Sequence, residues 1–600
     1  MPVFIESAKI LIVFSTISKS HVMPLEVVAK LLAERNHEVT FFTPFPSGKA
    51  IKNLREVQIP FDEKDKEFLN QIAKNPEDSS MFTMMKEMPK LITKTGNTTL
   101  QLPEMRRIMK EEKFDLLING YFMTEFILGL GDHFKVPTIV FSPAGALGNI
   151  HRMLGNPLSP SGAPHVLAQS VEFNFVGRIK NFFMNIIDVL VMRQIANYIG
   201  KEVYNYNFPP DQYRSYEESL RNVSLVLLNT HFSSARPRPY LPNMIEVGGL
   251  QVKPNPSPLP NDLKTFLDEA EDGAILFSLG SNAKSTFLPE NTIKTLLKAF
   301  SQIKQRVVMK WESDTLKGKP ENVFISKWLP QDDVLAHKNI KLFISHCGFG
   351  GLIEAKYHGV PILGIPLFAD QPANADMIEK EGWGKQISIN TITADELRDT
   401  INEMITNPKY ANVVKQLSLL AKDRPMNAQE TAIYWIEYVI RHHGAPHLHY
   451  PSADLNFFQD NSLDVIAFLV FTVYVIFKIL AFICKKIFCG TFCYLYIIPG
   501  EIGKSKDHPG HCYSREHSVL LKVGETTHTN QCEEISCYDD YSMRIAGCGT
   551  FSIQDPKCKK FIRDLSKPYP TCCTSFICVE PVDVFETSNH LDQVDRNSLE

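Results

Sequence analysis

Blocks of apolar residues near the start of the chain alternate with an amphipathic stretch and predict a βαβ unit. We expect a buried strand at 9–15, a loop at 16–20, a helix at 23–34 and a second strand at 38–43. The strands are continuous apolar runs, which is typical of parallel sheets buried on both faces. The opening pattern therefore predicts an α/β fold with a doubly wound sheet.

The same alternation of short apolar strands and helical stretches recurs as far as residue 443, with one interruption. The run 248–260 contains four prolines, which prevent a helix and favour an extended connector. Further strands are expected at 114–118, 138–141, 273–279, 306–310, 323–326, 342–345 and 362–365. Two doubly wound domains that face each other leave a cleft at the carboxyl ends of their strands, where ligands bind.

A longer apolar run at 465–484 has a different character. It is twenty residues long with Lys478 as its only charge, which is the length that a helix needs to cross a bilayer. We interpret it as a transmembrane anchor in which Lys478 extends toward the interface, and a buried core helix is the alternative. A second run, 487–498, is too short to span and predicts an interfacial or re-entrant segment.

Charge and cysteine content narrow the classes of partner and compartment. The 63 basic and 67 acidic residues give a net charge of −4 without a long run of either sign, so no nucleic acid is expected as a partner. Cys347 is the only cysteine before Cys484, whereas eight cysteines lie between Cys512 and Cys578. These eight predict a disulfide framework in an oxidising compartment, although no secretory signal is seen before the first strand.

The segment 343–354, Phe-Ile-Ser-His-Cys-Gly-Phe-Gly-Gly-Leu-Ile-Glu, carries the clearest chemistry. It reads as a strand that runs into a glycine-rich turn and opens a helix. Main-chain N–H groups at such a helix start can bind a diphosphate, helped by the helix dipole. Gly348, Gly350 and Gly351 would permit close approach, and His346 could add a donor.

Together with Trp328-Leu-Pro-Gln and the run 359–371, this segment resembles the signature of the UDP-glycosyltransferase family. The match extends at lower specificity over residues 8 to about 485, and its details are similar to insect members. The resemblance implies the GT-B architecture of two facing Rossmann-like domains, a UDP-sugar as donor substrate, and no metal or other cofactor. The domains it implies are 1–250 for acceptor binding, 251–262 as linker, 263–445 for UDP-sugar binding, and the transmembrane helix 465–484.

The resemblance also implies a role for individual residues. Trp328 and Gln331 would lie at the uracil, Glu354 at the ribose hydroxyls, and Asp370 with Gln371 at the sugar hydroxyls, as suits their stacking and hydrogen-bonding groups. Two positions depart from the pattern, because Cys347 stands where many members have Gly and Gly350 where vertebrate enzymes have Asn; neither change removes a backbone donor. The full UDP-sugar-binding set is Gly280, Ser281, Trp328, Gln331, His346, Cys347, Gly348, Gly350, Glu354, Asp370 and Gln371.

Catalysis in this family is an inverting displacement in which a histidine after the first strand removes the proton of the acceptor hydroxyl. His21 stands at the matching place, and a neutral imidazole is a suitable base. Its usual carboxylate partner falls on Gly120. Asn119 could orient the ring without neutralising it, and Glu125 lies further along the next helix. Either activity is lower than with a complete dyad, or the partner comes from elsewhere in the chain.

The N-terminal domain is expected to shape the acceptor pocket. Met and Phe gather at 81–85 and 173–192, and an apolar lining predicts a small lipophilic acceptor, as in detoxification. The alternative is that these are ordinary core and surface helices. The sequence does not determine the sugar donor or the acceptor, and we expect the sugar to be glucose. It also leaves open whether the chain forms a homo-oligomer.

The cysteine spacing of the tail, with Lys567-Pro-Tyr-Pro before a Cys-Cys pair, resembles single-domain von Willebrand factor type C proteins secreted by arthropods and places such a domain at 510–580. A zinc site is the weaker alternative. The family resemblance implies a single-pass protein of the endoplasmic reticulum membrane with lumenal catalytic domains. That topology puts the tail in the cytosol, where disulfides do not persist. The missing signal peptide favours the opposite orientation, in which cytosolic domains with a signal-anchor helix deliver the tail to the lumen. We favour a third account, a composite chain that joins parts of two neighbouring genes and lacks its true start.

Three functions follow from these patterns. The first is an active glycosyltransferase, the second a nucleotide-sugar-binding protein with impaired catalysis, and the third a surface interaction protein defined by the tail.

Overall fold

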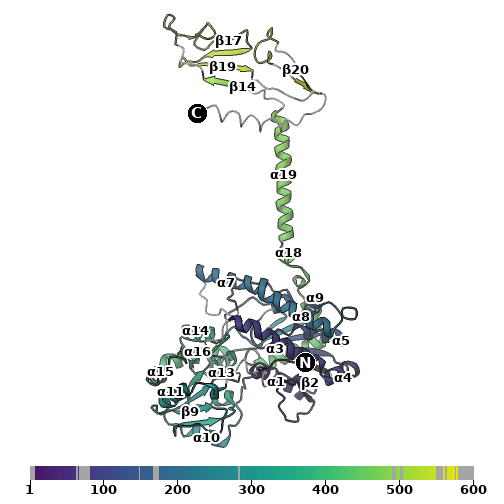
Figure 1. Cartoon of the computed structure of the whole chain (residues 1–600), viewed down its shortest axis with the longest axis vertical. Helices are drawn as coiled ribbons and strands as arrows, with labels where there is room; N and C mark the ends of the chain where they lie inside the picture. Colours follow the sequence, from purple (N-terminus) through teal and green to yellow (C-terminus); the bar gives the residue numbers. More distant parts are fainter. Residues whose placement is uncertain are drawn as a thin grey trace. The chain divides into compact units, whose positions relative to one another are not determined.

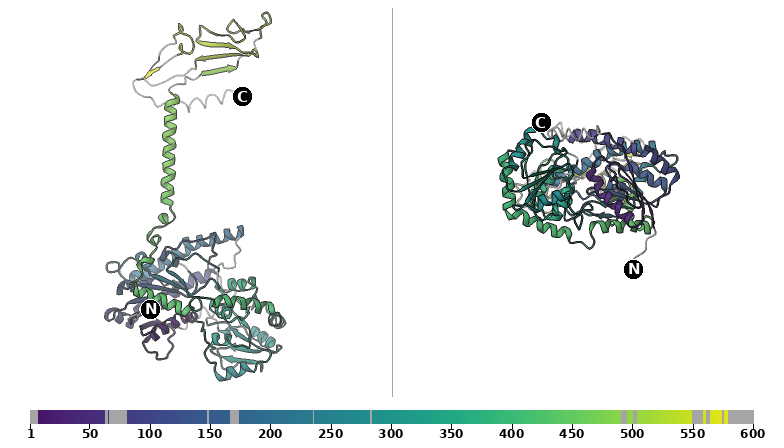
Figure 2. Two further views of the ribbon diagram at one scale, coloured as in Figure 1. Left: turned by 180° about the vertical axis from the view of Figure 1, so that it is seen from behind. Right: turned by 90° about the horizontal axis from the view of Figure 1, so that it is seen from below.

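The computed structural model describes residues 7–62, 65, 81–146, 149–165, 174–234, 236–281, 284–489, 495–499, 504–548, 558–560, 564–573 and 576–578. The chain forms two compact units, Met1–Asp460 and Asn461–Glu600. Within the first unit two lobes, each built on a parallel sheet, lie side by side (Figure 1, Figure 2). The predicted fold class is confirmed.

The first lobe contains a seven-stranded sheet in the order β3-β2-β1-β4-β5-β6-β7, with every pair parallel. The central strands are buried on both faces, as the continuous apolar runs of the sequence predicted. The strands are β1 (Lys9–Val13), β2 (Glu38–Thr43), β3 (Leu54–Gln58), β4 (Leu116–Gly120), β5 (Thr138–Ser142), β6 (Leu225–Leu228) and β7 (Met244–Glu246).

Helices cover both faces of this sheet, as in doubly wound folds (Figure 1). They are α1 (Lys19–Glu34), α3 (Met81–Gln101), α4 (Pro103–Glu111), η3 (Glu125–Leu128), α5 (Gly129–Phe134), α6 (Ile150–Leu154), α7 (Phe175–Ile187), η4 (Asp188–Met192), α8 (Arg193–Asn207) and α9 (Tyr216–Arg221).

The second lobe repeats the design with a six-stranded parallel sheet in the order β10-β9-β8-β11-β12-β13. Its strands are β8 (Ala274–Ser278), β9 (Arg306–Lys310), β10 (Val323–Ser326), β11 (Ile340–Ser345), β12 (Ile362–Gly364) and β13 (Gly384–Gln386). Its helices are α10 (Asn261–Asp268), η5 (Ser285–Phe287), α11 (Glu290–Phe300), α12 (Gln331–Leu335), α13 (Phe349–His358), α14 (Gln371–Lys380), α15 (Ala394–Thr406) and α16 (Pro408–Lys422).

The chain crosses between the lobes twice. After the proline-rich connector it returns in α17 (Ala428–Arg441), whose Ile433 and Ile436 share a core with the first sheet. Arg35 of the first lobe donates to Glu437 of α17 at 2.7 Å, and Gln429 donates to the backbone of the connector at Leu250. The domain boundaries stay predictions. The return of α17 gives the two lobes a second covalent connection, with packing and hydrogen bonds to the first lobe. The first unit ends in η6 (Pro446–Leu448), η7 (Pro451–Asp454) and α18 (Phe457–Asp460).

The second unit begins with α19 (Leu463–Cys489). Its segment Leu463–Ile483 is long and apolar enough to cross a membrane, and none of that segment is buried inside the structure. The buried-core alternative is therefore wrong. The run 487–498 was expected to form an interfacial or re-entrant segment. Instead, its end forms strand β14 (Leu495–Pro499), which pairs with β19 (Met543–Cys548) of the tail. Residues 490–494 lie outside the described part.

The tail is a small β structure held by disulfides. A sheet of order β14-β19-β18-β17 includes β18 (Glu533–Cys537) and β17 (Thr526–His528). Two hairpins accompany it, β15 (His511–Ser514) with β16 (Val519–Lys522), and β20 (Cys558–Lys560) with β21 (Phe576–Cys578). The disulfides join Cys512 to Cys537, Cys532 to Cys572 and Cys548 to Cys573.

These bonds confirm the predicted disulfide framework for six of the tail's cysteines. Cys558 and Cys578 stand opposite each other in the register of β20 and β21, and their side chains lie outside the described residues. A disulfide sulfur is no longer the thiolate that zinc requires. The zinc alternative is therefore wrong for the six paired cysteines.

Candidate active site

A cavity of about 620 Å³ lies between the two lobes of the first unit. Its walls come from the segments that follow β1, β5 and β6 on one side and β8, β11 and β12 on the other, which are the carboxyl ends of the strands. The sequence-predicted residues that line it are His21, Gly280, Ser281, Trp328, Gln331, His346, Gly348, Gly350, Glu354, Asp370 and Gln371. Tertiary structure thus brings together every predicted site residue except Cys347.

The glycine-rich turn after β11 packs tightly around the ring of His346. A Cβ atom at Gly280 would stand 2.5 Å from the His346 Cε1 atom, and one at Gly348 would stand 2.4 Å from its Nε2 atom. Gly280 also has a φ of +82°, which disfavours other residues. The close approach of the imidazole therefore leaves no room for a side chain at either glycine.

Electropositive groups converge on this turn. Gly348 is the N-cap of α13 and no side chain caps the helix, so the N–H groups of its first turn face the cavity without a side-chain acceptor. Burial, aided by the charge of Lys310, lowers the pKa of His346 to about 4, so the ring is neutral near pH 7. Its Nδ1 atom and the buried Ser281 hydroxyl have no hydrogen-bond partner in the described structure. Such orphaned polar atoms are expected where a ligand binds.

Lys310 is a cleft residue that sequence reasoning missed. It ends strand β9, lines the cavity, and donates from Nζ to the carbonyl of Gly280 and to Glu312, both at 2.7 Å. The available signal was a lysine at the carboxyl end of a short apolar strand, in Arg-Val-Val-Met-Lys, where ligand-binding residues of parallel sheets lie. Its charge lies beside the turn where a diphosphate would be held.

Trp328, Gln331 and Glu354, which the family resemblance assigns to the nucleoside, line the cavity together. Gln331 donates to the Glu354 carboxylate at 2.7 Å, which orients the acid for a vicinal diol. Burial raises the pKa of Glu354 to about 8. The Trp328 ring is 47% exposed, and the Lys19 ammonium of the other lobe lies 3.9 Å from its centroid. The sequence could not predict this contact, because Lys19 and Trp328 are far apart in the chain and belong to different lobes.

Asp370 and Gln371, which the resemblance assigns to the sugar hydroxyls, stand at the start of α14. Asn374 donates to the Asp370 carboxylate at 2.6 Å and to the backbone carbonyl of Cys347 at 3.0 Å. The Gln371 side-chain oxygen accepts from the backbone N–H groups of Leu367 and Phe368. Asp370 therefore offers an acceptor and Gln371 its amide N–H groups, the pair that a sugar diol needs.

Cys347 does not line the cavity. Its side chain is fully buried in the core beneath the turn, next to Gly364, where an added Cβ would stand 2.5 Å from the sulfur. Burial raises the pKa of the thiol, and the backbone N–H already donates to the Ser345 hydroxyl at 3.2 Å. Its inclusion in the predicted binding set rested on its place in the motif, and the structure gives the side chain a packing role.

His21 lies in the first turn of α1, on the opposite wall of the cleft. Its ring packs against Phe122 with centroids 4.8 Å apart. Burial lowers its pKa to about 4, and its buried Nδ1 atom has no hydrogen-bond partner in the described structure. A neutral imidazole is the form that can accept a proton.

The three candidates for a partner of His21 are engaged elsewhere. Gly120 has no room for a side chain, because a Cβ there would stand 2.1 Å from the Phe14 ring. The Asn119 amide donates to the Thr124 carbonyl at 3.4 Å. Glu125 accepts from the Tyr121 hydroxyl at 2.8 Å and belongs to a buried network, and burial raises its pKa. The sequence-predicted gap in the catalytic dyad therefore persists among the described residues.

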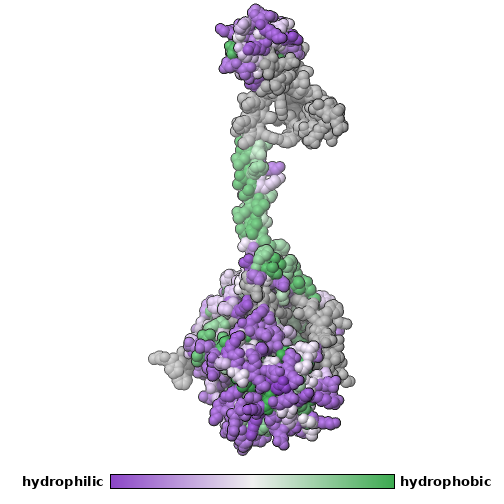
Figure 3. All heavy atoms as spheres, turned by 90° about the vertical axis from the view of Figure 1, so that its left-hand side faces the viewer, coloured by the Kyte–Doolittle hydropathy of each residue, from purple (hydrophilic) through white to green (hydrophobic). Residues whose placement is uncertain are grey.

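The acceptor wall differs from the sequence prediction. Met88, Phe122, Pro143 and Tyr240 line it, whereas the apolar side chains of α7, η4 and α8 do not. Those side chains are exposed, with Phe175 at 69%, and apolar spheres gather on this end of the first unit (Figure 3). The prediction that the Met and Phe side chains of 173–192 line the pocket was wrong for those that are described, because the apolar face of these helices turns outward. The side chains of 81–85 lie outside the described residues.

Comparison with known proteins agrees with this geometry. Residues 8–493 match the family described as UDP-glucoronosyl and UDP-glucosyl transferase. UDP-glucosyltransferase 2 of Dactylopius coccus is 36% identical over 497 residues, which covers 80% of this chain and 93% of that protein. UDP-glucuronosyltransferase 2A1 of Mus musculus is 29% identical, covering 81% of this chain and 94% of its own.

The solved structures and the tail add two further matches. A UDP-glucosyltransferase from Polygonum tinctorium covers 73% of this chain and 100% of its own, with a TM-score of 0.49 and 18% identity. Residues 512–578 match the single-domain von Willebrand factor type C family, as the cysteine spacing predicted. With a family match over most of its length and a relative at 36% identity, the chain belongs to the UDP-glycosyltransferase family.

Proposed function

We propose that this chain transfers glucose from UDP-glucose to a hydroxyl group of a small lipophilic acceptor, with inversion at the anomeric carbon. The observation that carries the proposal is the single cavity in which the nucleotide-sugar motif faces His21 across the two lobes. The glucose assignment is supported by the name of the insect relative, UDP-glucosyltransferase 2.

In the proposed mechanism, the second lobe holds the donor. The free N–H groups at the start of α13 bind the diphosphate, and Lys310 lies beside them. Trp328 and Glu354 bind the nucleoside, while Asp370 and Gln371 hold the hexose. These groups stabilise the charge that develops on the leaving UDP, so the proposal includes no metal or other cofactor.

The first lobe supplies the base. Neutral His21 accepts the proton of the acceptor hydroxyl as its oxygen forms a bond to the anomeric carbon, and the carbon–oxygen bond to UDP breaks with its electron pair going to the diphosphate. The imidazolium then releases the proton to solvent. Burial disfavours this charged ring, and Gly120 leaves it without the usual carboxylate. We therefore expect a slow enzyme.

We place the protein in the endoplasmic reticulum membrane as a single-pass protein with lumenal lobes. This topology conflicts with the tail disulfides, and the composite-chain account resolves the conflict by assigning the tail to a second gene. The exposed apolar helix α19 and the mammalian relatives are consistent with membrane anchoring. Protease protection in sealed microsomes tests the orientation. Lobes that are digested without detergent would contradict it.

Transfer is tested with detergent-solubilised full chain and radiolabelled UDP-sugars. We expect labelled product from UDP-glucose with phenol or sterol acceptors, and a lower rate from UDP-glucuronate. A matched reaction without acceptor measures hydrolysis of the donor. Binding of UDP without product from any pair would contradict the proposal.

That negative result would favour the second candidate, a nucleotide-sugar-binding protein with impaired catalysis. The specific observation behind it is the unpartnered Nδ1 atom of His21 together with the blocked Gly120 position. The third candidate, a surface interaction protein, is supported by the disulfide-bonded tail. It predicts a partner that binds the full chain in oxidising buffer and is released on reduction.

A further inference from the structure

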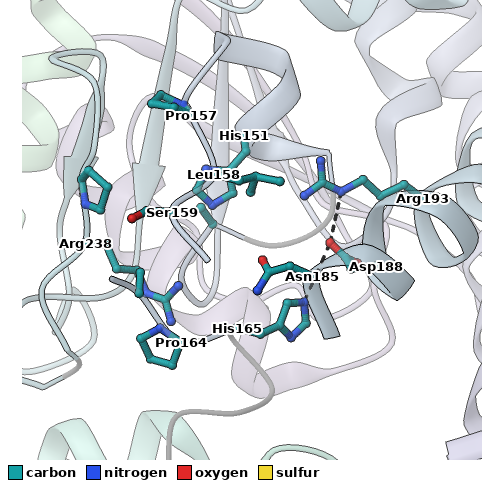
Figure 4. A pocket seen from close by; sticks show the side chains of 13 residues that line it. His151, Pro157, Leu158, Ser159, Pro164, His165, Asn185, Asp188, Arg193 and Arg238 are labelled. Carbon is teal, nitrogen blue, oxygen red and sulfur yellow. Dashed lines mark hydrogen bonds and ion pairs between the residues drawn. The ribbon is translucent and has the colours of Figure 1, made fainter. Parts of the chain in front are cut away.

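A second, smaller cavity lies in the first lobe (Figure 4). Its volume is about 40 Å³. Since one water needs roughly 10–15 Å³ by the same kind of measure, the cavity can hold a few non-hydrogen atoms. Arg238 lines both this cavity and the main cleft, so the small cavity is a side chamber of the acceptor wall.

The other charged groups of the chamber already satisfy one another. Asp188 accepts from Arg193 at 3.1 Å, and His165 lies 3.8 Å from the same carboxylate. Burial lowers the pKa of His151 to about 4, so this ring is neutral near pH 7, and its Nδ1 atom pairs with Asn156 at 2.8 Å. Arg238 therefore leaves the chamber with one positive charge in excess.

Arg238 is the unsatisfied member of the set. Its Nη2 atom is buried without a hydrogen-bond partner among the described residues, and its guanidinium points into the chamber toward Asn185 (Figure 4). Burial lowers the pKa of Arg238, an effect that the charges of Tyr240 and Glu246 only partly oppose. A buried cation without a paired anion is destabilising, which marks a place where an anion belongs.

We propose that Arg238 binds a carboxylate carried by the acceptor, so that the substrates of this enzyme are small hydroxyl compounds with an acidic group. This inference rests on the proposed transferase function and names its acceptor class. The guanidinium fork fits a carboxylate in two parallel hydrogen bonds. The chamber is large enough for that group and too small for a ring, so the body of the acceptor lies in the main cleft with its hydroxyl available to His21.

The test compares two acceptors that differ only in charge, 4-hydroxybenzoate and its methyl ester, on the full chain. We expect kcat/KM to favour the acid. Replacing Arg238 by Gln should lower kcat/KM for the acid by roughly ten- to a hundredfold, the range for a charged hydrogen-bonded pair, and leave the ester nearly unchanged. Arg238→Lys should retain part of the preference. Equal use of acid and ester by the unaltered chain, or an unchanged preference in Arg238→Gln, would overturn the proposal.

A second measurement does not depend on turnover. With UDP bound, 4-hydroxybenzoate should raise Tm for the unaltered chain and fail to do so for Arg238→Gln, even if no sugar is transferred. A chain that binds the acid in this way but makes no product would separate failure of the transferase function from failure of this inference. Without ligand, Arg238→Met should keep or raise Tm, because it removes an unpaired buried charge. A marked fall in Tm would show a structural role and contradict the assignment.

Discussion

The two walls of the cleft share one architecture but differ in how their polar side chains are paired. Each is the carboxyl edge of a parallel sheet, but the donor wall presents groups that are held in place by hydrogen bonds, such as Glu354 by Gln331 and Asp370 by Asn374. Both walls also hold buried polar atoms that have no partner among the described residues: His346 Nδ1 and the Ser281 hydroxyl on the donor wall, and His21 Nδ1 and Arg238 Nη2 on the acceptor wall. The donor wall therefore combines preorganised side chains with open ones, whereas on the acceptor wall both the proposed base and the proposed acceptor-binding cation depend on the substrate for a partner.

The largest effect should come from the acceptor wall. His21→Ala removes the proposed base, so kcat should fall roughly 10²- to 10⁴-fold, the usual contribution of general base catalysis. Because the ring lies on the wall opposite the nucleotide motif, the Kd for UDP should stay the same. Steady-state transfer assays and UDP titration check both. A variant that keeps more than half of its kcat would remove His21 from the mechanism.

On the donor wall, Gly348→Val should weaken UDP binding by roughly a hundredfold or more, since an N-terminal turn that cannot close loses several charge-assisted hydrogen bonds. The added Cβ would stand 2.4 Å from His346. Gly350→Val is the matched comparison, because its Cβ meets no atom of the chain nearer than Gln251 at 3.7 Å, so it tests close approach of the ligand without a clash with His346. Calorimetric titration with UDP measures both variants. An affinity equal to that of the unaltered chain in both would place the diphosphate elsewhere.

The missing carboxylate partner of His21 can be probed at Gly120. Gly120→Ala should lower the free energy of unfolding by about 1–3 kcal/mol, the range for overpacking a core, because the methyl group overlaps the Phe14 ring. Combining it with Phe14→Leu tests the cause, since the smaller side chain should return part of the loss. Denaturant unfolding measures both. A stable single variant would mean that a carboxylate could be accommodated there.

The pH dependence follows from the pKa of about 4 for His21 in the folded chain. This value lies below the unfolded pKa of about 6.5, so the neutral base is present at and above neutral pH and is lost as pH falls through about 4. We expect His21 to cause little change in kcat/KM for the acceptor between about pH 6 and 8, measured with saturating UDP-glucose so that donor binding through Glu354, whose pKa is about 8, does not contribute. The stability contribution has the same sign: it is complete above about pH 6.5 and decreases as pH falls from there toward 4. An inflection of kcat/KM near pH 6.5 would contradict the buried, unpaired ring.

The smallest effect is expected at Cys347. Its sulfur packs in the core rather than in the cleft, so Cys347→Ala should change the Kd for UDP by less than about twofold while lowering stability by about 1 kcal/mol, as for small core truncations. Titration and melting of the same sample test this. A large loss of affinity without a change in Tm would return the thiol to the binding site.

Much of the fold and of the donor wall could be read from the amino-acid order. Continuous apolar strands with helices between them determine a buried parallel sheet, because both faces must be covered. The turn from His346 to Gly351 and the residues around it are close in sequence, so one local motif carried most of the nucleotide site. The apolar length of α19 and the cysteine spacing of the tail are likewise local properties of the chain.

Only the tertiary structure decided what depends on residues far apart in the chain. Phe14 blocks Gly120 from more than a hundred positions away, Lys19 lies over Trp328 of the other lobe, and α17 returns to the first sheet. The same is true of the outward turn of α7, the burial of Cys347 and the chamber at Arg238. The physical reason is that burial, charge pairing and free space are set by all neighbours at once, and a linear pattern records only those along the chain.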